Sequence, residues 1–425
     1  MRSLDTHRVG FLLAAWLLLA AHAGSALAAE LLPLALPEAI NRALERSPGL
    51  AVTREDVAVA EARVGQAQVT PPVELGVELE NFGGSGELDG TDALETTLLL
   101  SRALELGGKR ARRIDVAQAG RESALAGLNA ARLDVATDVT RKFVDVLGAQ
   151  EQARAAARFL ELAQAIRAQA ERRVAAGNAL SAELYRAQAE VAREELFRLR
   201  SQAELDVTWR ALAATWGEPD ATRVAAAGDL FRTRPLEPLA ALLATLDQTP
   251  RLARLATAQR VREAERRLTE AQARPDVEIS LGARHLNEAG DTGFVVGASF
   301  PFGSRARNRA LVVESEASLR QIQAEQTAGR ISAVAALSGL HRQVEVRRET
   351  LEVLQRDVVP ATTAALEQID RGYRLGRLPY SEYALAAREA LDAQLERVRI
   401  ATEYHQLLAD LEGLTGTAVR MAPAP

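Results

Sequence analysis

The sequence predicts a mainly α-helical protein with a small β part, built from two copies of one structural unit. Three observations predict this fold: an internal repeat, long helical stretches, and four short segments in which apolar and polar residues alternate. The two copies span 29–219 and 246–416, and equivalent positions stay about 200 residues apart throughout. A linker at 220–245 separates the copies, and a tail at 417–425 follows them. A fixed internal period is typical of an architecture whose units become stable only side by side.

The composition is that of an extended helical protein. The chain has no cysteine, only 4% aromatic residues, and a hydrophobic fraction of 48% that consists mostly of Ala and Leu. Thin layers of small side chains between close helices fit this composition better than one globular core. The formal net charge is −5, so nucleic acid is not an expected partner.

Residues 1–28 are expected to be a signal peptide. Arg2 and Arg8 precede an apolar run at 9–21, and a small-x-small cleavage site follows at 26–28. The run is short for a bilayer, which makes a transmembrane anchor the less favoured alternative. Because no cysteine is present, we expect an exported protein without a lipid anchor.

Two β-hairpins are expected, at about 73–102 and 277–302. Each of their four segments alternates apolar and polar residues with period two, over roughly ten residues, the span of a tilted strand across an outer membrane. A soluble, half-buried sheet would show the same alternation. The positions on the first side of the four segments are Val73, Leu75, Val77 and Leu79; Leu94, Thr96, Leu98 and Leu100; Val277, Ile279, Leu281 and Ala283; and Phe294, Val296, Ala298, Phe300 and Phe302.

Four strands cannot close a barrel in lipid, because the smallest outer-membrane barrels use eight strands and open edges are not tolerated there. The chain is therefore expected to oligomerise. Two copies would give eight strands around an interior filled by side chains, whereas three would give twelve strands and leave a lumen. The acidic residues on the polar side of the strands suit a wet interior.

Long helices are expected at about 109–174, 181–216, 304–372 and 380–413. The first has no proline and would reach about 100 Å at ~1.5 Å per residue, so it must lie along another helix. Apolar residues recur at steps of three, four or seven, as they also would in an ordinary antiparallel coiled-coil stalk. Pro360 is expected to kink the third helix, with a tunnel narrowing beyond it.

The order of elements is similar to that of the TolC-type outer-membrane efflux proteins over nearly the whole mature chain. The resemblance is specific in LELGGKRARR, where strand turns into helix, and in the paired turns VAAGNALSAEL and YRLGRLPYSEY. The Gly-Gly-Lys-Arg junction resembles the branch that serves cobalt, zinc, cadmium or copper efflux. The resemblance implies a homotrimer with a twelve-stranded barrel in the outer membrane and a twelve-helix tunnel in the periplasm. It implies a passive conduit. The implied partners are a periplasmic adaptor and an inner-membrane pump of the resistance-nodulation-division type.

The resemblance also implies roles for the two helix-turn-helix tips, which receive the adaptor in the similar proteins. A glycine at such a reversal has a structural explanation as well, because it adopts positive φ angles freely. The tip residues are Ala176, Gly177 and Asn178 in the first copy and Leu375, Gly376 and Arg377 in the second.

A closing contact near the tips is implied by the same resemblance, which places Tyr373 against Glu183. Glu382 matches one position of an acidic ring, while the second ring position falls on Leu385 and a basic link position on Leu378. Both departures imply a gate with weaker electrostatics, in which Glu382 alone favours cations. The alternative for Glu382 is a solvated carboxylate on a helix face.

Two basic clusters follow the strands and are placed to meet lipid phosphates at the inner rim of the membrane. The alternative is that each is the solvated face of a helix. The clusters are Lys109, Arg110, Arg112 and Arg113 in the first copy and Arg305, Arg307 and Arg309 in the second.

The sequence indicates neither an enzyme nor a metal or cofactor site. No nucleophile elbow, phosphate loop or zinc-protease motif is present, and His285, His341 and His405 lie far apart without cysteine partners. Two other classes of protein remain open: a periplasmic adaptor, which has one helical hairpin and several small β-domains, and a coiled-coil structural protein of the envelope. For a conduit, drugs or other small molecules are the alternative cargo to heavy-metal cations.

Overall fold

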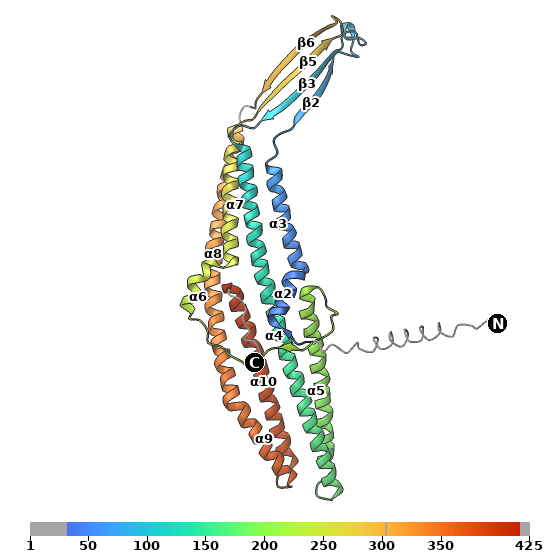
Figure 1. Ribbon diagram of the computed structural model, residues 1–425, viewed down its shortest axis with the longest axis vertical. Helices are drawn as coiled ribbons and strands as arrows, with labels where there is room; N and C mark the ends of the chain where they lie inside the picture. The colour runs from blue at the N-terminus through green and yellow to red at the C-terminus, as the bar shows by residue number, and fades with distance from the viewer. Residues whose placement is uncertain (1–31, 302–303, 417–425) are drawn as a thin grey trace, which may run out of the picture.

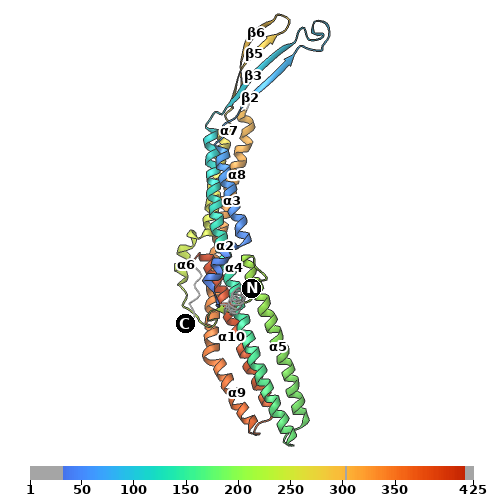
Figure 2. The ribbon, with the colours of Figure 1, turned by 45° about the vertical axis from the view of Figure 1, so that its right-hand side comes forward.

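The structure is a computed structural model, and it describes residues 32–301 and 304–416; for 304–307 it describes the backbone alone. The molecule is a long rod with a small β-sheet at one end and two helical hairpin tips at the other (Figure 1). The helices run along the rod, and a belt of irregular chain lies at mid-height (Figure 2).

The sheet consists of two hairpins joined edge to edge. All neighbouring strands are antiparallel, in the order β2-β3-β5-β6, so the first hairpin pairs with the second through β3 and β5. Phe302, expected at the end of the second hairpin, lies outside the described residues. The strands are β2 (Val73–Glu80), β3 (Glu95–Leu104), β5 (Val277–Leu286) and β6 (Asp291–Ser299).

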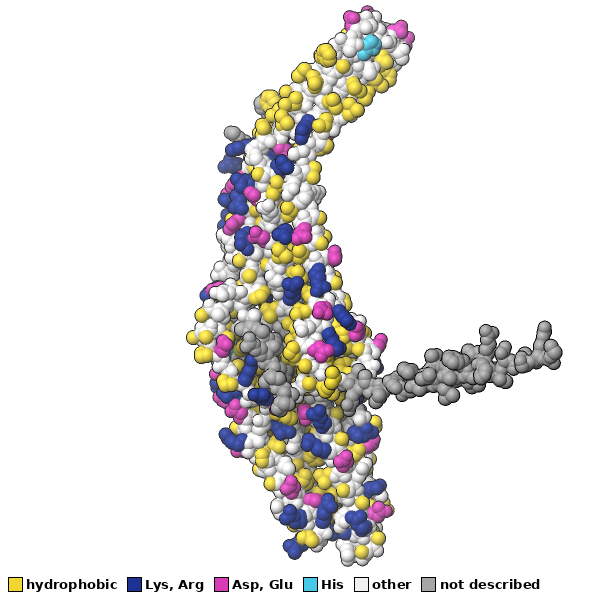
Figure 3. Space-filling view, viewed as in Figure 1, with side chains coloured by type: hydrophobic (Ala, Val, Ile, Leu, Met, Phe, Trp, Pro, Cys, Tyr) yellow, Lys and Arg dark blue, Asp and Glu magenta, His cyan; other side chains and the backbone are white. Residues whose placement is uncertain are grey.

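One face of the sheet is apolar and exposed. Partners across antiparallel strands lie on the same face, and one such row runs from Leu75 through Leu100 and Leu281 to Val296. These four side chains are between 51% and 76% exposed. Figure 3 shows hydrophobic side chains gathered along the strands, whereas charged side chains are spread over the helices. The isolated chain therefore offers an apolar surface that water does not favour.

The opposite face of the sheet is polar. Its central row pairs Glu78 with Thr97 and Thr97 with Arg284. Arg284 donates a hydrogen bond to Thr97 Oγ1 (3.0 Å) and forms an ion pair with Glu95 (2.9 Å). The alternation predicted from sequence thus separates an apolar face from a charged one.

The helices divide into an upper set beside the sheet and a lower set of two hairpins (Figure 1). Helix α4 belongs to both sets: its 67 residues contact α3 and α7 above and α5 and α10 below. Its sequence contains no proline, so nothing interrupts its hydrogen-bond ladder. The helices are α2 (Leu36–Arg46), α3 (Pro48–Ala67), α4 (Lys109–Ala175), α5 (Ser181–Ala213), α6 (Leu239–Thr245), α7 (Pro250–Gln272), α8 (Ser304–Val353), α9 (Val359–Arg374) and α10 (Tyr380–Thr415).

The long helix of the second copy is interrupted, unlike α4. A π-helical turn at Leu354–Val358 separates α8 from α9, and Pro360 is the second residue of α9. Proline has no N–H, and its ring crowds the carbonyl four residues earlier, here that of Arg356. The wider π turn accommodates this loss. The helix was expected to be irregular at Pro360, and its irregular π turn lies just before this proline.

The belt at mid-height contains most of the linker and the largest hydrophobic core. Strand β1 (Leu34–Ala35) pairs in parallel with β4 (Ala226–Ala227), close to the buried side chains of Phe143, Trp209 and Trp216. Gln150 of α4 holds β4 by bonding both the N–H (2.7 Å) and the carbonyl (3.1 Å) of Ala226. Long-range side-chain hydrogen bonds thus fix a segment that has little regular structure.

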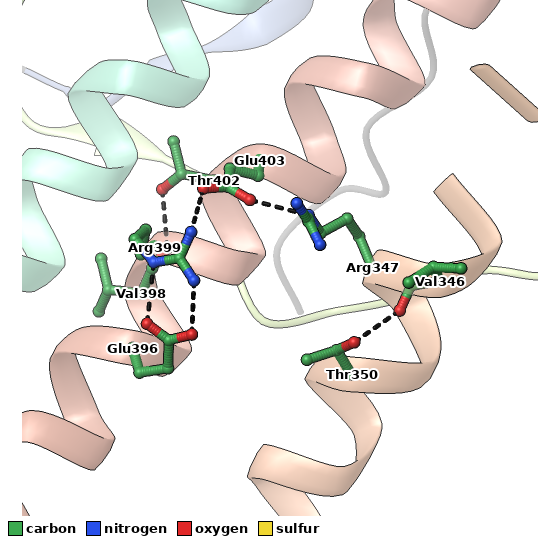
Figure 4. A network of polar contacts seen from close by, with 8 residues as sticks. All are labelled: Val346, Arg347, Thr350, Glu396, Val398, Arg399, Thr402 and Glu403. Atoms are coloured by element: carbon green, nitrogen blue, oxygen red, sulfur yellow. Dashed lines mark hydrogen bonds and ion pairs between the residues drawn. The ribbon is translucent and has the colours of Figure 1, made fainter. Parts of the chain in front are cut away.

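Charged side chains link α8 and α10 on the surface of the rod. Arg347 of α8 forms an ion pair with Glu403 of α10 (2.8 Å), and Arg399 contacts both Glu396 and Glu403 (Figure 4). Such exposed pairs contribute about 0–1 kcal/mol each, so burial of apolar side chains is what holds these helices together.

Candidate functional site

Two turns at the end of the rod away from the sheet connect α4 to α5 and α9 to α10 (Figure 1). Gly177 and Gly376 both have φ of 71°, a conformation that glycine adopts without a Cβ clash. In each turn the N–H groups of the glycine and of the next residue bond carbonyls of the last helical turn. The two copies therefore end in the same backbone geometry.

The tip residues are open to solvent. All six residues at 176–178 and 375–377 are exposed, and Leu375 is 60% exposed. An exposed leucine at the point of a turn is available for contact with another protein. Binding at the tips stays a prediction.

Tyr373 and Glu183 join the two hairpins just above the tips. The hydroxyl of Tyr373, in the last turn of α9, donates a 2.8 Å hydrogen bond to Glu183 Oε1 in the first turn of α5. Tyr373 is fully buried, and burial together with this hydrogen bond raises its pKa above the ordinary value. The phenol therefore stays protonated and can donate at any physiological pH. The contact implied by the resemblance is present, and its role in closing a tunnel stays a prediction.

Arg173, at the end of α4, completes this contact, and sequence reasoning missed it. Its Nη1 donates to the carbonyl oxygen of Tyr373 (3.1 Å), and its Nε lies 3.4 Å from Glu183 Oε1. The guanidinium carbon also lies 4.9 Å from the centre of the Tyr373 ring, within the range of a cation–π contact. One arginine thus touches both partners of the inter-hairpin hydrogen bond. Its position four residues before Gly177 was the feature of the sequence that could have indicated a role for Arg173 near the tip.

An aromatic cluster surrounds Tyr373. The ring centres of Tyr380 and Tyr383, in the first turn of α10, lie 6.1 and 5.7 Å from that of Tyr373. Burial raises the pKa of Tyr380 to about 12 and that of Tyr383 further. Three of the five tyrosines of the chain lie between 373 and 383, a local enrichment that could have indicated the cluster.

Glu382 lies beside this cluster but points away from it. It is exposed in the first turn of α10, and Leu385, three residues on, is 57% exposed. Residues three apart share one face of a helix, so the carboxylate and the leucine face solvent together. Leu378 instead packs over Gly372, where an added Cβ would lie 2.7 Å from its Cδ1. The ring assigned to Glu382 needs other copies of the chain and stays a prediction.

The basic residues after the first hairpin are tied to the protein itself. Lys109 forms an ion pair with Asp276 (2.7 Å), Arg113 pairs with Glu105, and Arg112 pairs with Asp115. Arg110 donates to the carbonyl oxygen of Gln68 (2.9 Å). The contacts of Lys109, Arg110 and Arg113 brace the joint between sheet and helices, whereas the Arg112 pair lies within α4. Arg309 is exposed, while the side chains of Arg305 and Arg307 lie outside those described.

A further arginine lies at the same level on the apolar face of the sheet. Arg102, near the end of β3, pairs across the strands with Val73 and Ile279, and its Nη2 donates to Thr70 Oγ1 (3.3 Å). It is exposed. The sequence pattern did not indicate Arg102, because the apolar alternation of its strand stops at Leu100.

Comparison with known proteins decides the family. The model for "Outer membrane efflux protein" matches residues 39–218 and 242–417, once for each copy of the repeat. The chain belongs to this family. Its fold is accordingly that of an outer membrane efflux channel.

Relatives of this outer membrane efflux protein include two resistance proteins. The chain is 28% identical over 386 residues to the cobalt-zinc-cadmium resistance protein CzcC of Cupriavidus metallidurans, which covers 90% of each chain. It is 26% identical to the nickel-cobalt-cadmium resistance protein NccC of Alcaligenes xylosoxydans xylosoxydans, over 74% of this chain and 72% of the relative. Among solved structures, CusC superposes with a TM-score of 0.76 at 17% identity, covering 90% of this chain and 92% of that chain.

The three histidines in the part of the chain that the structure describes have structural contacts. His405 Nε2 lies 3.0 Å from the carbonyl oxygen of Leu230, and His341 Nε2 lies 3.0 Å from that of Glu237, so both hold the belt. His285 contacts the Thr292 hydroxyl across a hairpin. Within residues 32–301 and 304–416, no group of three or more His, Cys, Asp or Glu side chains gathers as a metal site. In that part of the chain, no helix is both long enough and apolar enough to cross a membrane.

Proposed function

We propose that this protein is the outer membrane channel of a tripartite efflux system of the resistance-nodulation-division type, and that it carries heavy-metal cations. The observation that supports heavy-metal cations as the cargo is the similarity to CzcC over 90% of both chains. NccC, a second relative, is also named for resistance to metals. The channel acts as a passive conduit, without enzymatic activity and without a cofactor.

The channel is a homotrimer in this proposal. The sheet has two outer strands, β2 and β6, and among the described residues each of them pairs with a strand on one side alone. Such edges are costly in hydrocarbon, and three sheets of four strands would join them into a closed twelve-stranded barrel. The apolar face would meet lipid, and the face carrying Glu78 and Arg284 would line the lumen.

In this proposal, the N-terminal signal peptide directs the protein out of the cytoplasm toward the outer membrane. The segment 1–28 would be removed as a signal peptide, leaving a protein without a lipid anchor. The helices below the sheet would then hang in the periplasm. The basic residues near the joint and Arg102 would lie at the inner rim, where lipid phosphates are within reach.

The tips would meet a periplasmic adaptor, which in turn joins an inner-membrane pump. Support comes from the exposure of Leu375 and its neighbours and from the matching backbone of both turns. Just above them, the contact between Tyr373 and Glu183 holds the hairpins together and would keep the tunnel end closed. Three copies of Glu382 around that end would attract cations.

The test is complementation in a Gram-negative host that lacks its own channel but contains a cognate adaptor and pump. Expression is expected to lower the cell content of cobalt, zinc or cadmium, measured by mass spectrometry, and to restore growth on these metals. The matched control is Leu281→Arg, which places a charge on the apolar face of the sheet and is expected to prevent insertion. Unchanged metal content together with a lower content of a fluorescent drug would identify a drug channel instead.

A further inference from the structure

A small cavity lies where the two lower hairpins meet. Its volume is about 20 Å³, which is room for roughly one water molecule. Helices α4, α5 and α10 all contribute to its wall, which includes Phe159, Ile166, Glu190, Glu194, Tyr380 and Tyr383.

Glu194 is the unusual member of this wall. The residue is only 7% exposed, and among the described residues its Oε2 atom has no hydrogen-bond partner. A buried carboxylate without a partner is costly when it is ionised, whereas the neutral acid is far less so. The packing in the structure therefore suits the protonated form of Glu194.

Of the charged neighbours of Glu194, Arg388 offsets its charge only in part. On the same helix, Glu190 repels it and is itself paired with Arg193. From α10, Arg388 lines the cavity but pairs with Asp392 (3.2 Å). The other titratable groups of the wall are the neutral phenols of Tyr380 and Tyr383, and α4 contributes only uncharged residues. Burial first, and Glu190 second, raise the pKa of Glu194 above its ordinary value.

The cavity is connected to the contact that joins the hairpins. Tyr380 and Tyr383 line the cavity and also pack against the ring of Tyr373. The hydroxyl of Tyr373 bonds Glu183 on α5, the helix that carries Glu194. A displacement of α5 at Glu194 would thus be transmitted through packed rings to the tip.

We propose that Glu194 is a proton-binding site that links pH to the closure of the tips. With Glu194 protonated, α5 packs against α4 and α10 as in the structure. Ionisation favours a state in which α5 moves away from α10, so that the carboxylate gains water and the tip contacts loosen. The inference rests on the proposed function, because it concerns the opening of the same channel.

The experiment measures the distance between the two tips of one chain. The chain has no native cysteine, so spin labels at Asn178→Cys and Arg377→Cys are unique, and an excess of unlabelled chain isolates the distance within one subunit. Pulsed electron paramagnetic resonance on the full-length protein in detergent is compared at about pH 5 and about pH 8. We expect a population with a longer distance to grow at the higher pH.

Glu194→Gln is expected to abolish this shift and to keep the shorter distance at both pH values. The matched control is Glu195→Gln, which removes a partly exposed carboxylate paired with Arg198 on the same helix and is expected to leave the shift intact. Should the glutamine variant not assemble, Glu194→Met offers a neutral side chain of similar size, with the same expectation.

A wild-type distance that does not change with pH, or a shift that persists without the Glu194 carboxylate, overturns the inference. These outcomes are separate from those for the proposed function. A pH-dependent shift in a protein that does not lower cell metal content would contradict the proposed cargo alone. The absence of a shift in a protein that does export metal would contradict the proton site alone.

Discussion

The guanidinium of Arg173 and the aromatic ring of Tyr373 lie 4.9 Å apart, although their residues are 200 positions apart in the chain. Arg173 lies in the last turn of the first long helix, and Tyr373 lies in the last turn of the corresponding helix of the second copy. Their contact and the hydrogen bond from Tyr373 to Glu183 are where the two halves of the repeat hold each other at the tips.

Removing the hydrogen bond is expected to open the channel more often. Tyr373→Phe deletes the donor to a carboxylate, an interaction worth about 1.5–3 kcal/mol, so the ratio of open to closed states should rise roughly 10- to 100-fold. Single-channel recording in planar bilayers measures this ratio. Tyr185→Phe, which changes an exposed tyrosine of α5, serves as the control. The same open fraction in Tyr373→Phe and in wild type would contradict the gate.

Arg173→Met is expected to act on the same equilibrium. It removes contacts with both Tyr373 and Glu183, so its effect and that of Tyr373→Phe should be strongly non-additive in a double-mutant cycle. Arg172→Met is the matched control, because Arg172 is exposed and its side chain bonds only Gln169 among the contacts the structure describes. Independent, additive effects of Arg173 and Tyr373 would show that the arginine does not position the tyrosine.

Gly376→Ala is expected to lower the thermal stability of the second tip. No atom lies within 4 Å of the added methyl group, so the cost comes from the positive φ alone, about 1–2 kcal/mol. Gly339→Ala on α8 also meets no atom, but lies in a helix, where alanine is favoured by about 0.5–1 kcal/mol. Circular dichroism melts of the two variants should therefore shift in opposite directions. Shifts of the same sign would mean that the turn does not require a positive φ.

Stability is expected to fall in mild acid through His405. Burial lowers the pKa of His405 to about 4, so the folded protein resists a proton that the unfolded chain accepts at about 6.5. Its contribution is complete above pH ~6.5 and is lost as pH falls toward 4, by at most about 3 kcal/mol. His405→Met should lack this loss in denaturant titrations, whereas His285→Gln, at an exposed hairpin position, should retain it. Parallel curves for wild type and His405→Met would exclude His405 as the cause.

The two faces of the sheet are expected to respond differently to one added charge. Leu281→Arg lies on the apolar face and should reduce trimer recovery from the outer membrane, because arginine in mid-bilayer costs about 2–4 kcal/mol. Ser280→Arg, the next residue of β5, lies on the polar face and should assemble normally. Gel mobility of unheated, detergent-extracted protein reports the trimer. Equal recovery of both variants would contradict an apolar face in lipid.

The strands, the long helices and the positions of both tips could be predicted from sequence. Each depends on a short-range pattern: the period of two in β2, the proline-free run of α4, and the glycines at 177 and 376. These patterns depend on backbone geometry within a few residues, so they can be recognised in the sequence without knowledge of the fold. The pairing of Tyr373 with Glu183 was available only through resemblance to a family.

Tertiary structure alone decided which polar groups are buried and what they meet. Arg173 and Glu194 look like their many exposed neighbours in a charged helix. Only the packing of one hairpin on the other gives Arg173 its contacts with Tyr373 and Glu183, and leaves Glu194 Oε2 without a hydrogen-bond partner among the described residues. The irregular belt is likewise held by distant side chains such as Gln150. Burial depends on residues far apart in the chain that become neighbours in space, and a local pattern does not encode that proximity.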